Sequence, residues 1–150
     1  MSRAEKAKEY FNEGFACSQA VALAFSDVIG VGEDEIKKIM LPFGGGFGRL
    51  RLVCGAVSGM TMVCGLIFAK AENSEDNKKA VYELERELCA RFQSENGSLI
   101  CADLLSGANL QVTVGGDAEK RTSEYYKKRP CDEIVYVAAE ILDKYLTENA

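Results

Sequence analysis

The sequence contains no histidine among its 150 residues. Histidine is the usual general base of enzymes at neutral pH, the partner of many catalytic cysteines, and a common ligand of zinc and haem. Its absence excludes a Cys–His nucleophile pair, a His-ligated zinc site and a His-ligated haem. Any redox or metal chemistry of this chain must therefore depend on sulfur and carboxylate groups.

The sequence also lacks any C-x-x-C pair, although it contains six cysteines. That spacing is the signature of zinc ribbons, thioredoxins and bacterial ferredoxins, and C-x-x-C-H is the attachment motif of c-type haem. The spacing of the cysteines therefore indicates no particular function. The cysteines have to be interpreted from their positions in the predicted helices. They are Cys17, Cys54, Cys64, Cys89, Cys101 and Cys131.

Prolines are scarce, at two, and no segment alternates polar and apolar residues as a half-buried strand does. Apolar residues instead recur at helical spacing along most of the chain. The pattern predicts helices over about 2–12, 17–30, 33–40, 53–70 and 75–94, a short turn or helix from 101, and a last helix from 131. We expect an all-α fold, a helical bundle that forms one domain over residues 1–150.

The segment 53–70 carries no charge before Lys70 and approaches the length of a membrane span. Its glycine, serine and threonine residues make it poorly hydrophobic, so we interpret it as the buried central helix of the bundle and not as a membrane-spanning helix. Gly55 and Gly59 lie on one face of this helix, where a second backbone can approach closely.

The formal charge is −5, and the basic residues are interleaved with acidic ones. Such a surface offers no basic face for phosphates, so nucleic acid is not an expected partner. The charged first residues are followed by no apolar segment of the signal-peptide type, which predicts a cytoplasmic protein. In that compartment several cysteines indicate thiol redox chemistry, a metal site or ordinary core residues.

Four of the cysteines lie at or near predicted helix starts: Cys17, Cys54, Cys101 and Cys131. The free amides of a helix N-terminus stabilise an anionic sulfur, so this position favours thiolate chemistry. Taken singly, each is more simply a buried core residue. Their shared position predicts that at least Cys17, Cys54 and Cys131 converge on one shielded pocket, with Cys101 either closing over it or standing apart. Cys64 and Cys89 lie in helix interiors and resemble packing residues.

A glycine-rich run, 43–49, precedes Cys54. Its backbone amides could hold an anion or cofactor group with help from nearby arginines. The residues of this candidate site are Gly44, Gly45, Gly46 and Arg49, helped by Arg51. The run matches neither the P-loop nor the dinucleotide-binding pattern, and a close-packed loop that lets Cys54 meet other helices is the simpler interpretation. A guanidinium near Cys54 would favour its thiolate.

These motifs resemble the C_GCAxxG_C_C family, whose members are named as redox-active for their cysteines. The resemblance is carried by residues 16–21, 43–49, Cys54-Gly55-Ala56-Val57-Ser58-Gly59, 101–105 and Cys131. It implies four family cysteines at Cys17, Cys54, Cys101 and Cys131, and it implies a redox partner or a transporter-associated protein as partner, because family genes often lie beside transporter genes. A related domain in split-Soret cytochromes, which combine haem with an iron–sulfur centre, supports a cluster; haem itself is excluded by the missing histidines.

Three functions remain open. The first is thiol–disulfide or thiol-transfer chemistry centred on Cys54 as nucleophile, with Cys17, Cys101 or Cys131 as the resolving thiol. The second is an iron–sulfur or other metal protein in which these four cysteines are the ligands. The third is a non-catalytic helical partner protein whose cysteines are packing residues. The sequence leaves open the cofactor, the redox partner and whether the chain forms a homodimer.

Overall fold

The computed structural model describes residues 1–149 and confirms the predicted all-α fold. The elements in chain order are α1 (Arg3–Asn12), α2 (Cys17–Leu23), α3 (Glu33–Met40), the 3-10 turn η1 (Leu41–Phe43), α4 (Gly44–Phe47), α5 (Gly55–Phe68), α6 (Glu75–Asn96), α7 (Cys101–Gly107), α8 (Ser123–Lys128) and α9 (Cys131–Glu148). One isolated antiparallel bridge joins Val53 to Ile100. None of the helices within residues 1–149 combines the length and the apolar character needed to cross a membrane.

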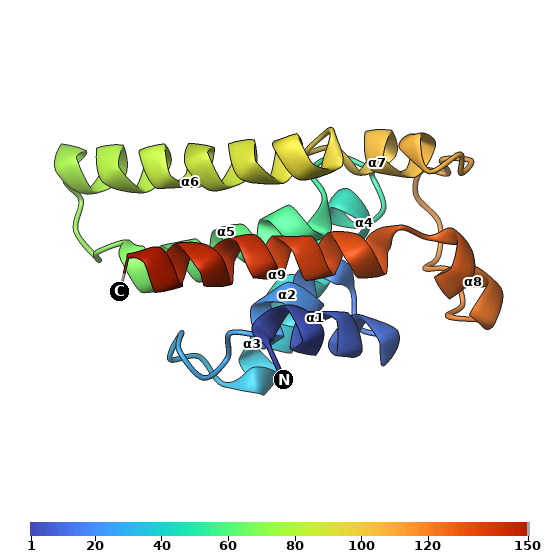
Figure 1. Cartoon of the computed structure of the whole chain (residues 1–150), viewed down its shortest axis with the longest axis horizontal. Coiled ribbons are helices and arrows are strands. Elements are labelled where there is room, and N and C mark those ends of the chain that lie inside the picture. Colours follow the sequence, from blue (N-terminus) through green and yellow to red (C-terminus); the bar gives the residue numbers. More distant parts are fainter. Residues whose placement is uncertain (150) are drawn as a thin grey trace.

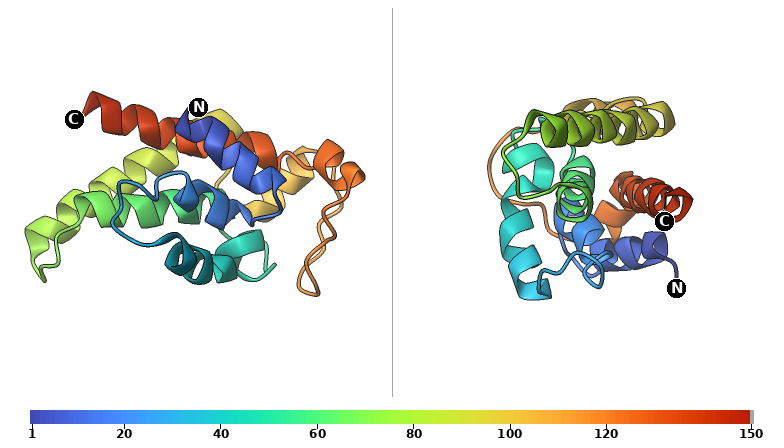
Figure 2. Two further views of the ribbon diagram at one scale, coloured as in Figure 1. Left: turned by 90° about the horizontal axis from the view of Figure 1, so that it is seen from below. Right: turned by 90° about the vertical axis from the view of Figure 1, so that its left-hand side faces the viewer.

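Helix α5 occupies the centre of the bundle, as its lack of charge predicts. Helices α2, α6 and α9 all pack against it, and Figure 1 shows α6 on one side of α5 and α9, with α1, α2 and α3 on the other. The view along the long axis in Figure 2 shows the same enclosure of α5. The side chains of Met60 and Val63 are fully buried there, so this helix forms much of the common core.

Helix α2 is shorter than its apolar spacing predicts, because it ends at Leu23 and not at Gly30. The backbone beyond it forms turns with hydrogen bonds between residues three apart. The Arg3 guanidinium donates a hydrogen bond of 2.9 Å to the Ala24 carbonyl. In a continuing helix this carbonyl would accept a hydrogen bond from a backbone amide instead. In an uninterrupted helix Val28 would share the buried face of Val21 and Ala24; it is exposed instead.

The close approach predicted at Gly55 and Gly59 is confirmed. A Cβ atom on Gly59 would lie 2.7 Å from the Ser18 carbonyl oxygen, and one on Gly55 would lie 3.3 Å from Cys17 Cβ. These distances leave no room for side chains between α2 and α5. The two glycines therefore bring the start of α2, with Cys17, against the start of α5, which follows Cys54.

We expect Gly59→Ala to lower the free energy of unfolding by about 1–3 kcal/mol, because the added methyl group overpacks the contact with α2. Gly65→Ala is the matched control, since it lies in the same helix and its Cβ would meet nothing within 4 Å. That control should be neutral or stabilising by up to about 1 kcal/mol, as expected from helix propensity. Urea unfolding followed by circular dichroism measures both, and equal effects of the two alanines would contradict the close approach.

Candidate functional site

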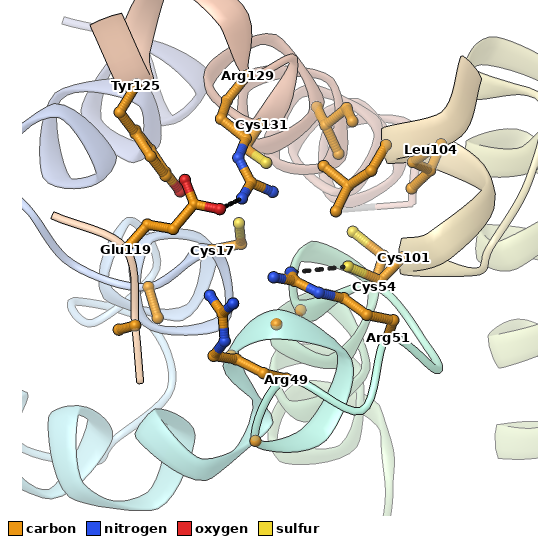
Figure 3. Close-up of a pocket in the computed structure, with 18 of the residues that line it drawn as sticks. Cys17, Arg49, Arg51, Cys54, Cys101, Leu104, Glu119, Tyr125, Arg129 and Cys131 are labelled. Carbon is orange, nitrogen blue, oxygen red and sulfur yellow. Dashed lines mark hydrogen bonds and ion pairs between the residues drawn. The ribbon is translucent and has the colours of Figure 1, made fainter. Parts of the chain in front are cut away.

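The four helix-start cysteines surround one cavity. Cys17, Cys101 and Cys131 are the first residues of α2, α7 and α9, and Cys54 is the residue immediately before α5. All four line a cavity of about 300 Å³ (Figure 3). The sulfurs expected in one place thus lie around one pocket, Cys101 included. All are free thiols.

Arginines from separate parts of the chain line the same cavity. They are Arg49 and Arg51, which follow the glycine-rich run, and Arg121 and Arg129, which flank α8. Among the described lining residues, Glu119 is the only acidic one, and its carboxylate pairs with the Arg129 guanidinium. Sequence reasoning missed Arg121, Arg129 and Glu119. Of these three residues, only Arg129 could have been recognised from the sequence as part of the site, because it lies two residues before Cys131.

The backbone that carries Arg49 and Arg51 is strained. Phe47, Arg49 and Arg51 all have positive φ angles, of 66°, 68° and 62°. Residues other than glycine adopt this left-handed backbone region at a cost of order 1 kcal/mol each. Backbone carbonyls of residues 113 and 115 hold the two guanidinium groups in place. Arg49 Nε donates to the Gly115 carbonyl and Arg51 Nε to the Thr113 carbonyl, both at 2.9 Å.

The glycines of this run divide between two positions. Gly44, Gly45 and Gly48 line the cavity together with Arg49, whereas Gly46 is buried away from it. A Cβ on Gly46 would lie 2.6 Å from the backbone nitrogen of Leu52, and its φ is +69°. Packing therefore explains Gly46, as the close-packed interpretation of the loop expects.

The Cys17 and Cys131 thiols are neighbours within the cavity (Figure 3). The interaction of the Cys131 sulfur with the Cys17 thiol is the largest cause that lowers the pKa of Cys131. Burial opposes the shift, and the guanidinium groups of Arg129, Arg121 and Arg51 reinforce it. The same interaction, together with burial, raises the pKa of Cys17 well above its usual range. Of the two sulfurs, Cys131 is therefore the one that loses its proton more readily.

Cys54 differs from the expectation based on its helix-start position. Backbone hydrogen bonds from Ala56 and Val57 favour its thiolate, but burial dominates and raises the pKa of Cys54 to about 12. Desolvation penalises the charged form more than two amides favour it. At neutral pH the Cys54 thiol is therefore protonated, and the prediction of a stabilised thiolate at this position is wrong.

Two groups hold the region around the Cys17–Cys131 pair in place. Arg121 donates to the carbonyls of Phe11 and Phe15 at 3.0 Å each, and its guanidinium lies over the Tyr125 ring at 4.9 Å from the centroid. Burial raises the pKa of Tyr125, which also lines the cavity. Arg121 is therefore a fixed charge near the sulfurs and not a freely moving side chain.

The arrangement of the sulfurs does not fit a metal site. Within residues 1–149, no group of three or more cysteine, aspartate or glutamate side chains is placed to hold a metal ion. The surrounding guanidinium groups also disfavour a single bare metal cation, but not an iron–sulfur cluster, which carries net negative charge when four thiolates hold it. Cys64 and Cys89 lie outside the cavity on α5 and α6, and burial raises the pKa of each to about 11. They behave as the packing residues that their helix-interior positions predict.

Four free thiols thus line one arginine-rich cavity of an all-α bundle. A family described as "Putative redox-active protein (C_GCAxxG_C_C)" matches residues 15–145. The chain belongs to this family, and the resemblance noted in its sequence motifs is confirmed. No curated protein and no solved structure shows a match to the chain.

Proposed function

We propose that the cavity is a thiol–disulfide exchange site in which Cys131 attacks the substrate and Cys17 is the resolving thiol. The observation that supports this most directly is that the two thiols adjoin one another in the cavity, where their interaction lowers the pKa of Cys131 and raises that of Cys17. A nucleophile next to a protonated second thiol is the arrangement that two-step disulfide exchange requires.

The proposed reaction balances with the groups present and one disulfide substrate. The Cys131 thiolate attacks one substrate sulfur, the substrate S–S bond breaks, and the first substrate thiolate leaves. That thiolate takes the proton of Cys17 directly or through solvent. The Cys17 sulfur then attacks Cys131 Sγ, which releases the second substrate thiolate and leaves a Cys17–Cys131 disulfide. The substrate disulfide is reduced and the protein dithiol is oxidised; a dithiol reductant restores the protein.

In this proposal Cys54 does not begin the reaction, because its pKa of about 12 leaves almost no thiolate at neutral pH. Cys101 accepts a hydrogen bond of 3.7 Å from Arg51 Nη1 and so positions that guanidinium beside the reacting pair. We therefore assign the role of nucleophile to Cys131 and not to Cys54, which the sequence suggests. Cys54 and Cys101 are the thiols that complete the cavity wall.

The test is to oxidise the reduced protein with bis(2-hydroxyethyl) disulfide and map its cysteines by peptide mass spectrometry. We expect one intramolecular disulfide between Cys17 and Cys131, reversed by dithiothreitol. Cys64 and Cys89 are internal controls, since burial raises the pKa of both and they lie outside the cavity. Oxidation at those two positions first, or no reaction at all, would contradict the proposal. A brown protein with stoichiometric iron after anaerobic purification would support the iron–sulfur hypothesis in its place.

A further inference from the structure

Arg51 has a buried donor with no partner. Its residue is only 6% exposed, and its Nη2 is buried without any hydrogen bond, while Nε donates to the Thr113 carbonyl and Nη1 to the Cys101 sulfur. An unpaired buried guanidinium nitrogen costs the desolvation free energy of a polar group, which no hydrogen bond offsets. Figure 3 shows this guanidinium pointing in among the cavity sulfurs. A ligand acceptor that bonded Nη2 would remove the cost.

The charge of the cavity specifies the sign of that ligand. Four guanidinium groups line it against one carboxylate, that of Glu119, which is already paired with Arg129. Arg49 and Arg121 donate to neutral carbonyls, so their charges are not compensated by those bonds. Even with a thiolate at Cys131, positive charge remains in excess. A partly desolvated cationic cavity of this kind attracts and holds an anion.

The size and walls of the cavity specify the rest of the ligand. A volume of about 300 Å³ lies at the lower end for small-molecule sites and is too small for a folded protein segment. Leu104, Leu105 and Ile134 form part of the wall, so the cavity offers an apolar surface as well as its charges. A compact molecule with a short apolar body and an anionic end fits both features.

We infer that the substrate is a small disulfide that carries a carboxylate or sulfonate group, with the anionic group on Arg51 and the S–S bond facing Cys131. This inference rests on the proposed exchange reaction and names its substrate class. Arg51 acts as a binding residue, because it holds the substrate anion while Cys131 and Cys17 perform the exchange. Neutral and cationic disulfides of the same length reach the same thiols but bring no negative charge to the Arg51 guanidinium.

The experiment compares three disulfides of similar length: 3,3′-dithiodipropionate, which is anionic, bis(2-hydroxyethyl) disulfide, which is neutral, and cystamine, which is cationic. We expect the second-order rate constant of the wild-type protein to be at least about 10-fold higher for the anion than for the neutral compound, and lowest for the cation. Arg51→Gln should reduce the anion-to-neutral ratio several-fold, although Arg49 and Arg121 still line the cavity, and Arg51→Lys should retain more of the ratio. The ratio cancels any change in the reactivity of Cys131 that the substitution causes.

Arg86→Gln is the matched control, because Arg86 is exposed on α6 and does not line the cavity. Its ratio should equal that of the wild type. If Arg51→Gln does not fold, the wild type still tests the inference: suberate, in which two methylene groups replace the S–S of dithiodipropionate, should slow alkylation of Cys131, and 1,8-octanediol should not. Reaction with the neutral disulfide but no anion preference and no suberate protection would overturn this inference alone. Failure of every disulfide to react would overturn the proposed function.

Discussion

Replacement of Cys131 by serine is expected to lower the rate of small-disulfide reduction by about 100-fold or more, because the pKa of Cys131 is lowered whereas the pKa values of Cys17 and Cys54 are raised. Cys54 in particular is protonated at neutral pH, since burial raises its pKa to about 12. Stopped-flow or thiol-release measurements with bis(2-hydroxyethyl) disulfide give the rate. The serine hydroxyl is close in volume to the thiol, so the fold should be retained and the free energy of unfolding should change little.

Replacement of Cys17 by serine should give a different result. The first exchange still occurs, but no resolving thiol stands beside Cys131, so a mixed disulfide between Cys131 and half of the substrate should accumulate to one equivalent. Intact-protein mass spectrometry measures this adduct. Cys54→Ser is the control and should complete the reaction as the wild type does. Loss of activity in Cys54→Ser, with activity retained in Cys131→Ser, would return the nucleophile to the position that the helix-start argument favoured.

Much of the fold was predictable because its determinants are local. The spacing of apolar residues and the Ser74 and Gly97 end signals predict α6, and Ser74 does cap it while Gly97 adopts the left-handed conformation at its end. The early end of α2 was not predictable. It depends on Arg3, whose guanidinium reaches the Ala24 carbonyl from another helix, and no local pattern reveals such a contact.

The site was predictable in its members but not in its electrostatics. Each helix-start cysteine has free amides nearby, so local reasoning treats Cys54 and Cys131 alike. The structure separates them because burial dominates at Cys54, whereas at Cys131 the Cys17 thiol and the guanidinium groups of Arg129, Arg121 and Arg51 outweigh it. Arg129 lies two residues before Cys131, but Cys17 and Arg51 are remote from it in the sequence. Such long-range contacts are what a single sequence does not display.

The pairing of Cys17 with Cys131 leads to an expected pH dependence. Cysteine reacts with iodoacetamide as the thiolate and not as the thiol. The alkylation rate of Cys131 therefore stays constant above the pKa of Cys131 and falls as the pH drops through that pKa. Because the pKa of Cys131 is lowered from its ordinary value, we expect the wild-type rate to fall at a lower pH than that of Cys64 or Cys89, whose pKa values burial raises to about 11. Alkylation of each cysteine against pH, followed by peptide mass spectrometry, measures this order.

Cys17→Ala is expected to move the Cys131 profile to higher pH and to reduce its alkylation rate at pH 7 several-fold, because it removes the neighbouring thiol whose interaction is the largest cause of the lowered pKa. Cys17→Ser keeps a hydroxyl donor at the same position and should move the profile less. Arg129→Gln removes a charge whose effect ranks below that of the Cys17 thiol, so its shift should have the same sign and be smaller than that of Cys17→Ala. If the alanine variant kept the wild-type profile while Arg129→Gln displaced it, the arginines alone would hold the Cys131 thiolate, and Cys17 would act only after the first exchange.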